Sequence, residues 1–245
     1  MKKMIVAFLF AVLPVAVFAE EGPHLDRADV DVHDKASLQR GARLFTNYCL
    51  SCHSAAYERY NRMGKDLGLT DDEVKNNLMF ASEKIGDTMT VAMPPVDAKK
   101  WFGNPPPDLS VMARARGADY IYTYLRSFYV DEKKPTGMNN TVFKDVGMPN
   151  VLWELQGLQK PVYKTEKDAE GHDVQVIAGF EQVTKGTMTP AEFDQAALDL
   201  TNFLVYMGEP AQLQRKSMGI WVLLFLGVLF VFAYALKKEY WKDVH

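Results

Sequence analysis

Cysteine is scarce in this sequence: only two cysteines occur among 245 residues, and two positions separate them. Such a pair cannot cross-link a chain of this length, so a fold stapled by disulfide bonds is excluded. Histidine is scarce as well, with five residues. Four of these stand alone in the sequence, which argues against a structural zinc site, because such a site needs four Cys or His ligands.

An excess of positive charge is also lacking, since 28 basic residues face 31 acidic residues for a formal net charge of −3. Without a basic stripe to neutralise phosphates, no nucleic-acid partner is expected. Hydrophobic residues make up 48% of the chain, which is too apolar for a disordered or fibrous protein. One globular domain is therefore expected.

The N-terminus has the pattern of a secretory signal peptide. Two lysines precede an uncharged apolar run from Met4 to Phe18, and small residues occupy the −3 and −1 positions before a cut after Ala19. We therefore expect residues 1–19 to be removed, with an uncleaved anchor helix as the alternative. Cleavage would leave 26 basic against 31 acidic residues, a net charge of −5.

A second apolar segment lies near the C-terminus. Gly219 to Leu236 contains eighteen residues without a charge, enough for a helix of roughly 27 Å. Trp221, Tyr234 and Tyr240 lie near its ends, as interfacial anchors do. The pattern predicts a transmembrane helix, with a buried core helix as the alternative. The signal peptide then sets the orientation: residues 20–214 are exported, and 215–245 form the anchor and a short cytoplasmic tail.

Helical patterns dominate the segment between these two apolar runs. Helices are expected over 34–48, 71–81, 120–129 and 190–208. The prolines crowded between 92 and 109 predict an extended loop, because proline lacks an amide donor. A β-hairpin is expected over 161–178. The predicted fold is mainly α, with long loops, a small hairpin and one C-terminal membrane helix.

Cys49, Cys52 and His53 form the Cys-x-x-Cys-His motif. This spacing is typical of covalent haem c attachment, in which both thiols add to vinyl groups and the imidazole becomes the proximal iron ligand. Export agrees with this chemistry. A thiol oxidoreductase is the alternative, but its Cys-x-x-Cys follows a strand in a βαβ unit, and no such pattern precedes Cys49.

A low-spin haem carrier needs a sixth iron ligand, usually methionine. Met93 and Met148 both precede a proline in irregular backbone, where a side chain is free of helical constraint. Met93 follows His53 by 40 residues and Met148 by 95. The residues alone leave both methionines open as ligands.

Several motifs, taken in order, resemble one family. Residues 40–45 ahead of the cysteine motif resemble the first helix of cytochromes c. Four later features, in order, are similar to those of a bacterial member of the cytochrome c1 family. They are Pro106-Pro107-Asp108-Leu109-Ser110, then Ala113 to Arg116 with Asp119-Tyr120, then Gly147-Met148-Pro149, and finally a single C-terminal span. The charged segment 164–173 departs from the family pattern and carries no expected function.

The resemblance implies one covalently bound haem c, with Met148 as the sixth ligand and Arg116 and Tyr120 near a haem propionate. The loop at 104–107 would wrap the haem edge. Arg114 has a surface salt bridge as its simpler explanation.

The resemblance also implies a place in the cell and a set of partners. The chain would be a periplasmic electron-transfer subunit of the bacterial inner-membrane cytochrome bc1 complex, within a dimeric assembly with cytochrome b. It would accept an electron from the Rieske iron–sulfur protein and pass it to a cytochrome c, while quinol oxidation occurs in the other subunits. The alternatives are a free-standing tethered cytochrome that serves an oxidase or reductase, and a haem sensor or peroxidase with an open sixth site.

Overall fold

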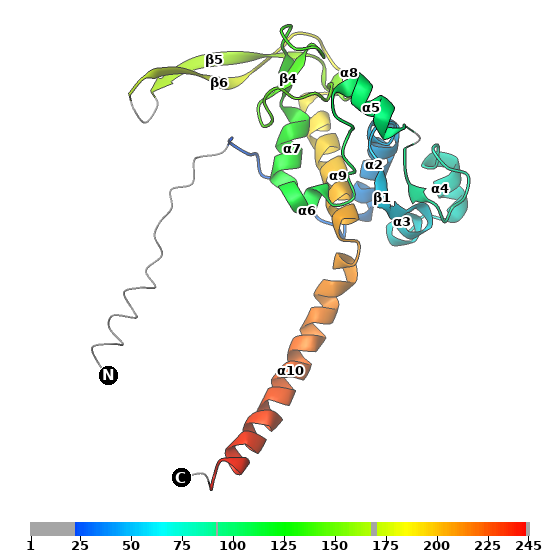
Figure 1. Ribbon diagram of the computed structural model, residues 1–245, viewed down its shortest axis with the longest axis vertical. Coiled ribbons are helices and arrows are strands. Elements are labelled where there is room, and N and C mark those ends of the chain that lie inside the picture. Colours follow the sequence, from blue (N-terminus) through cyan, green and yellow to red (C-terminus); the bar gives the residue numbers. More distant parts are fainter. Residues whose placement is uncertain (1–22, 92, 168–170, 244–245) are drawn as a thin grey trace.

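The computed structural model describes residues 23–91, 93–167 and 171–243, so the predicted signal peptide lies outside the described residues. A helical domain forms the body of the molecule, and two elements project from it (Figure 1). One is the long helix α10 (Gln212–Tyr240), and the other is the hairpin of β5 (Gln159–Lys167) and β6 (Asp173–Gln182). The mainly α prediction is confirmed.

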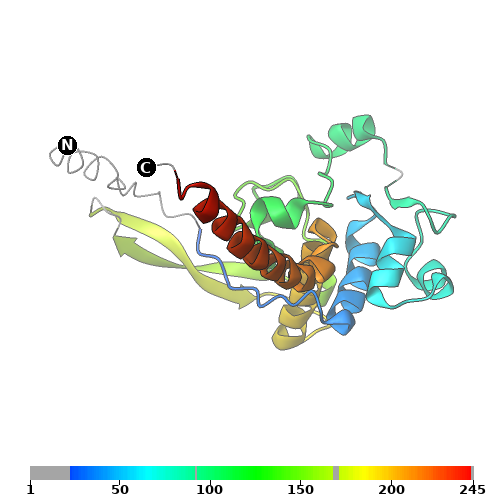
Figure 2. The same cartoon turned by 90° about the horizontal axis from the view of Figure 1, so that it is seen from below.

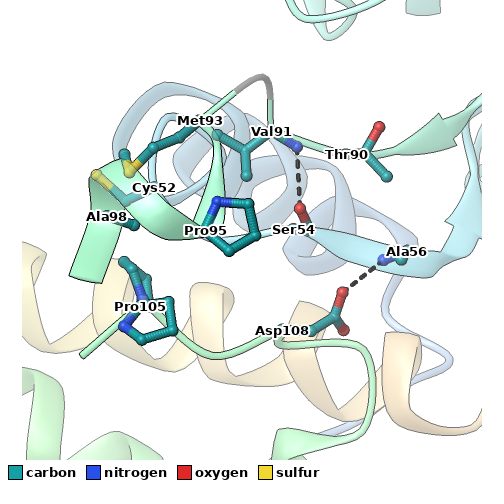
Figure 3. Close-up of a pocket in the computed structure, with 11 residues that line it drawn as sticks. Cys52, Ser54, Ala56, Thr90, Val91, Met93, Pro95, Ala98, Pro105 and Asp108 are labelled. Atoms are coloured by element: carbon teal, nitrogen blue, oxygen red, sulfur yellow. Dashed lines mark hydrogen bonds between the residues drawn. The ribbon is translucent and has the colours of Figure 1, made fainter. Parts of the chain in front are cut away.

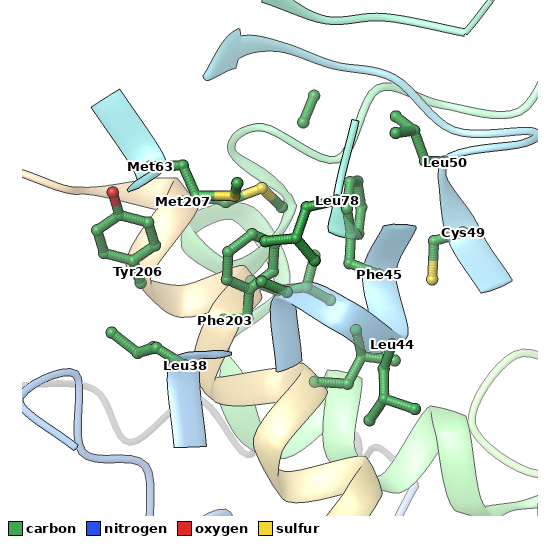
Figure 4. Close-up of a cluster of buried hydrophobic side chains, with 14 of the residues drawn as sticks. Leu38, Leu44, Phe45, Cys49, Leu50, Met63, Leu78, Phe203, Tyr206 and Met207 are labelled. Atoms are coloured by element: carbon green, nitrogen blue, oxygen red, sulfur yellow. The ribbon is translucent and has the colours of Figure 1, made fainter. Parts of the chain in front are cut away.

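Helices α2 (Lys35–Leu44) and α9 (Pro190–Gly208) form the centre of the core. Each begins at a side-chain cap: Asp34 accepts the amide of Ser37, and Thr189 forms a capping box with Glu192. Between the two helices the fully buried rings of Phe45 and Phe203 pack with their centroids 5.6 Å apart (Figure 4). The 190–208 helix was predicted with these bounds.

Gly41 permits the close approach of these two helices. A Cβ at this position would lie 2.1 Å from the backbone oxygen of Asp199 and 2.7 Å from Cβ of Phe203. The buried Asp199 carboxylate also binds Arg40 through two hydrogen bonds of 2.6 and 2.8 Å. The glycine and the ion pair together fix how α2, which leads into the cysteine motif, lies on α9.

The predicted helix over 34–48 is present, but its last turn widens into a π-helical turn, η1 (Phe45–Cys49). The remaining elements of the domain follow in chain order: β1 (Ala55–Arg59), α3 (Tyr60–Leu67), α4 (Asp71–Asn77), β2 (Thr88–Met89), α5 (Pro95–Phe102), α6 (Met112–Arg116), α7 (Ala118–Arg126), β3 (Phe128–Val130), β4 (Met138–Asn140) and α8 (Trp153–Gln156). β1 pairs with β2, β3 with β4 and β5 with β6, each pair antiparallel.

Three predicted elements differ in extent or type. The capped helix α4 ends at Asn77 rather than at 81, and α7 ends at Arg126, after which the chain forms β3. The proline-rich segment, expected to be an extended loop, contains the short helix α5. Pro95 begins α5, where a missing amide hydrogen costs no helical hydrogen bond and the fixed φ favours the helix.

The hairpin prediction over 161–178 is confirmed, with pairing that runs from Gln159 and Gln182 at the base to Lys167 and Asp173 near the tip. In the views of Figures 1 and 2 the hairpin reaches away from the body of the domain. Every described residue of its two strands is at least partly exposed.

Helix α10 contains the apolar run that the sequence places at 219–236, and it extends further on both sides. It has 29 residues, its most apolar stretch has a mean hydropathy of 2.5, and no residue of this fully described helix is buried. At about 1.5 Å per residue, 29 residues span roughly 43 Å. The helix is thus long and apolar enough to cross a membrane.

Candidate haem site

The cysteine motif forms a compact turn at the end of η1. The amides of Cys52 and His53 both donate to the carbonyl oxygen of Cys49, at 3.0 and 2.8 Å. Both cysteines are free thiols, Cys49 buried and Cys52 half-buried. The backbone therefore holds two thiols and one imidazole within a single turn, as attachment of a haem at two vinyl groups requires.

The His53 ring is oriented by a backbone carbonyl. Its Nδ1 lies 2.8 Å from the oxygen of Pro107. Because a carbonyl oxygen only accepts, Nδ1 carries the hydrogen and Nε2 retains its lone pair. Burial lowers the pKa of His53 below its ordinary value, an effect opposed by the bond to Pro107 and by the charge of Asp108. The imidazole is therefore neutral at pH 7, which is the form that binds iron.

The segment that contains Pro107 is fastened to the chain that follows His53. The amide of Leu109 donates to the backbone oxygen of Ser54 at 2.8 Å. Oδ2 of Asp108 accepts the amide of Ala56 at 2.9 Å, as Figure 3 shows. These bonds position the Pro107 carbonyl beside the imidazole. The proline-rich segment thus supports the His53 ring, a role that the sequence alone does not indicate.

A cavity of about 340 Å³ lies against this turn. Cys52, Met93 and Pro95 line it together with Pro105 and Asp108, and Figure 3 shows Cys52 and Met93 at the same end. Of the two candidate axial methionines, Met93 is the one on this cavity wall.

Met148 lies elsewhere, at the end of a row of aromatic side chains on α7. Its sulfur is 3.3 Å from the hydroxyl of Tyr124. The Tyr124 ring stacks on Tyr120 with centroids 6.2 Å apart, and the Arg116 guanidinium lies 5.4 Å from the Tyr120 ring centre. We call Arg116, Tyr120, Tyr124 and Met148 the tyrosine row. The structure brings these three predicted residues together through Tyr124.

Tyr124 was missed by the sequence analysis. Burial raises the pKa of its phenol, so the hydroxyl stays protonated and available as a donor. The four-residue spacing from Tyr120 places both rings on one helix face, and this periodicity could have identified it.

Arg114 forms the surface salt bridge that is its simpler explanation. It forms a salt bridge of 3.3 Å with Glu209, and its side chain is 60% exposed. Glu209 also holds Arg215 at the start of α10, so Arg114 helps to join the domain to that helix.

The surroundings of the two cysteines argue against the alternative that this chain is a thiol oxidoreductase. Burial and the neighbouring Cys52 raise the pKa of Cys49 to about 12, whereas reactive cysteines of such enzymes have lowered values. The motif also precedes β1, the first strand in the described part of the chain. Within residues 23–91, 93–167 and 171–243, no three His, Cys, Asp or Glu side chains are grouped so as to hold a metal ion, so a zinc site finds no support there.

Comparison with known proteins shows the family. The model of the cytochrome C1 family matches residues 27–244. The chain belongs to the cytochrome c1 family. A cytochrome c1 of Allochromatium vinosum is 50% identical over the full length of both chains. A protein of Nitrosomonas europaea named ammonia monooxygenase gamma subunit is 45% identical over 99% of this chain and all of its own. A cytochrome c1 of Rhodospirillum rubrum is 30% identical over 86% of this chain and 83% of its own.

Membership of the cytochrome c1 family makes this chain a haem-carrying electron-transfer subunit of the cytochrome bc1 type, with a c-type haem as its cofactor. It also explains α10 as a membrane anchor, the one helix in the described part of the chain that is long and apolar enough to cross a membrane.

Proposed function

We propose that Cys49, Cys52 and His53 hold one haem c, with both thiols in covalent linkage and Nε2 of His53 as the proximal ligand. The hydrogen bond from Nδ1 of His53 to Pro107 carries this proposal, because it fixes the tautomer in which Nε2 is the free nitrogen. When bound, the haem supplies an iron centre that accepts and releases one electron. The chain's own residues orient the imidazole and exclude water from one side of it.

Met148 is proposed as the sixth ligand, and Met93 as a wall of the cavity beside Cys52. The family resemblance favours Met148, and the tyrosine row supports it because the partly buried Tyr124 hydroxyl contacts the Met148 sulfur and would hold its orientation. A thioether ligand favours ferrous iron and keeps the reduction potential high. Arg116 and Tyr120 are proposed to donate hydrogen bonds to a haem propionate, as a guanidinium and a phenol can.

The matched pair Met148→Leu and Met93→Leu tests the ligand. A thioether–iron bond gives ferric c-type cytochromes a weak near-red absorption band. Met148→Leu is expected to abolish the band, and Met93→Leu to retain it. The reverse result would transfer the ligand role to Met93. A parent protein without the band would favour the haem sensor or peroxidase with an open sixth site.

The electron path is proposed to run from the Rieske iron–sulfur protein through this chain to a cytochrome c, with cytochrome b as a further partner in a dimeric complex. The expected net charge of −5 after cleavage suits encounter with a basic acceptor. Copurification in mild detergent tests whether the chain is part of such a complex, and cytochrome b is expected to accompany it. A lone chain would favour the free-standing tethered cytochrome instead. Recovery with an ammonia-oxidising enzyme would favour the role in the Nitrosomonas europaea relative's name.

The proposed organisation has a cleaved signal at 1–19, a periplasmic haem domain at 20–214 and an anchor with a short cytoplasmic tail at 215–245 in the bacterial inner membrane. The anchor is supported by the exposed apolar surface of α10. N-terminal sequencing of the purified chain is expected to begin at Glu20, and protease added to intact spheroplasts is expected to digest the haem domain. Protection of that domain would reverse the orientation.

A further inference from the structure

Glu58 is a carboxylic acid buried in the core close to the cysteine motif. It lies in β1, five residues after His53, and the residue is only 3% exposed. Its Oε1 has no hydrogen-bond partner among the described residues. Buried carboxyl groups are rare, and those with an unsatisfied oxygen are costly, so this position calls for an explanation.

Three titratable groups act on Glu58 from the elements packed around it. Arg62 and Asp66 come from α3, and Tyr206 comes from α9. These three are joined to one another: Nε of Arg62 lies 2.6 Å from Oδ2 of Asp66, and the Tyr206 hydroxyl donates to the same oxygen at 2.9 Å. Glu58 therefore faces a cluster with one cation, one anion and one phenol.

The cluster leaves Glu58 poised between its two protonation states. Burial raises its pKa to about 7. The Arg62 charge and a hydrogen bond from the Arg59 amide oppose that rise, and the nearby Asp66 charge adds to it. Burial and the charges of Glu58 and Asp66 raise the pKa of Tyr206, so the phenol stays protonated. Glu58 is thus the group of this cluster that changes charge near neutral pH.

We propose that Glu58 is a proton-binding site coupled to the oxidation state of the haem held by the cysteine motif, taking up a proton when the haem is reduced. This rests on the proposed haem attachment. When the donor protein supplies one electron to the haem, the fraction of Glu58 present as the acid would increase, and the added protons would come from water. Oxidation by the acceptor reverses both transfers.

Distance sets the size of the coupling. Five residues of extended chain reach at most about 17 Å from His53 to Glu58. Over such a distance, with an effective dielectric constant of about 20, one charge changes the equilibrium of another on the order of fivefold. The coupling is therefore measurable, although it is weaker than a strict one-proton, one-electron exchange.

The cluster around Glu58 reaches the surface at α3. The Asp66 side chain is 15% exposed and the Arg62 side chain 47% exposed, and the Tyr206 hydroxyl donates to Asp66. This edge of α3 is the proposed place of proton exchange with water.

The test is a spectroelectrochemical titration of the full chain in detergent, with redox mediators. At a fixed electrode potential near the midpoint, the ratio of reduced to oxidised haem is expected to fall on the order of fivefold between pH 6 and pH 8. Glu58→Gln, which is neutral at every pH, should remove that fall. The exposed Glu83→Gln is the matched control and should retain it.

A second readout and a second variant extend the test. The infrared difference spectrum between reduced and oxidised chain should contain a carboxylic acid C=O band that is lost in Glu58→Gln. Arg62→Met retains Glu58 but removes the cation that lowers its pKa, so the pH at the middle of the fall should rise. This second variant keeps the proposal testable if Glu58→Gln folds poorly.

The outcomes separate the two proposals. A chain that carries haem but shows the same pH dependence in the parent and in Glu58→Gln, with no carboxyl band, overturns the role of Glu58 and leaves haem attachment intact. A chain that does not bind haem overturns the proposed function itself.

Discussion

The buried Glu58 carboxyl predicts an unusual pH dependence of stability. Its pKa is about 7 in the folded chain, against an ordinary value of 4.5 that applies when the chain is unfolded. Because the folded value is raised, the group's contribution is fully present below about pH 4.5 and is lost as pH rises through 7. At 1.36 kcal/mol per pH unit, the loss between pH 5 and pH 8 is roughly 2–3 kcal/mol.

Glu58→Gln isolates this contribution because the amide keeps the shape and remains neutral. Thermal unfolding of the detergent-solubilised full chain, followed by far-UV circular dichroism, should give similar midpoints for parent and variant at pH 5. At pH 8 the variant should unfold roughly 4–12 °C higher, since about 1 kcal/mol changes the midpoint by 2–4 °C in a domain of this size. Glu83→Gln should follow the parent throughout. If the difference between Glu58→Gln and the parent does not change with pH, Glu58 is not a buried neutral acid.

Three other perturbations test the packing and the tyrosine row. Gly41→Ala places a Cβ against the backbone of α9, so it should destabilise the chain by about 1–3 kcal/mol in a denaturant titration, and an unchanged midpoint would contradict the close packing. Arg40→Met leaves the Asp199 carboxylate buried without its cation, which should cost roughly 2–4 kcal/mol in the same assay, and a stable variant would make the pair dispensable. Tyr124→Phe removes the hydrogen bond to the Met148 sulfur, so cyanide should bind the ferric chain up to about tenfold more tightly, whereas unchanged affinity would argue that the bond does not hold the ligand.

Local signals in the sequence were enough to predict several elements. Helix α9 has its capping box at Thr189, proline at the first position and Gly208 at its end, and the structure follows those limits. The hairpin was predictable from its alternating apolar residues around a charged turn. In both cases the neighbouring residues along the chain determine the element, so tertiary contacts do not alter it.

The features that could not be predicted from the sequence depend on contacts between residues that are far apart along the chain. The carbonyl of Pro107 contacts His53 across 54 positions, and no periodic pattern marks a backbone acceptor. A charged residue such as Glu58 is expected at the surface, and its burial depends on tertiary packing that the local sequence does not reveal. The cysteine motif was recognisable because its chemistry depends on spacing within one turn. The choice between Met93 and Met148 depends on how separate loops fold against each other.

The most direct test of the account is the intact mass of the purified chain after denaturation and treatment with an alkylating reagent. Covalent attachment at Cys49 and Cys52 predicts the mass of the polypeptide that begins at Glu20 plus one haem, with no alkyl groups added. A mass that corresponds to the polypeptide with two alkylated cysteines and no haem would contradict the central claim.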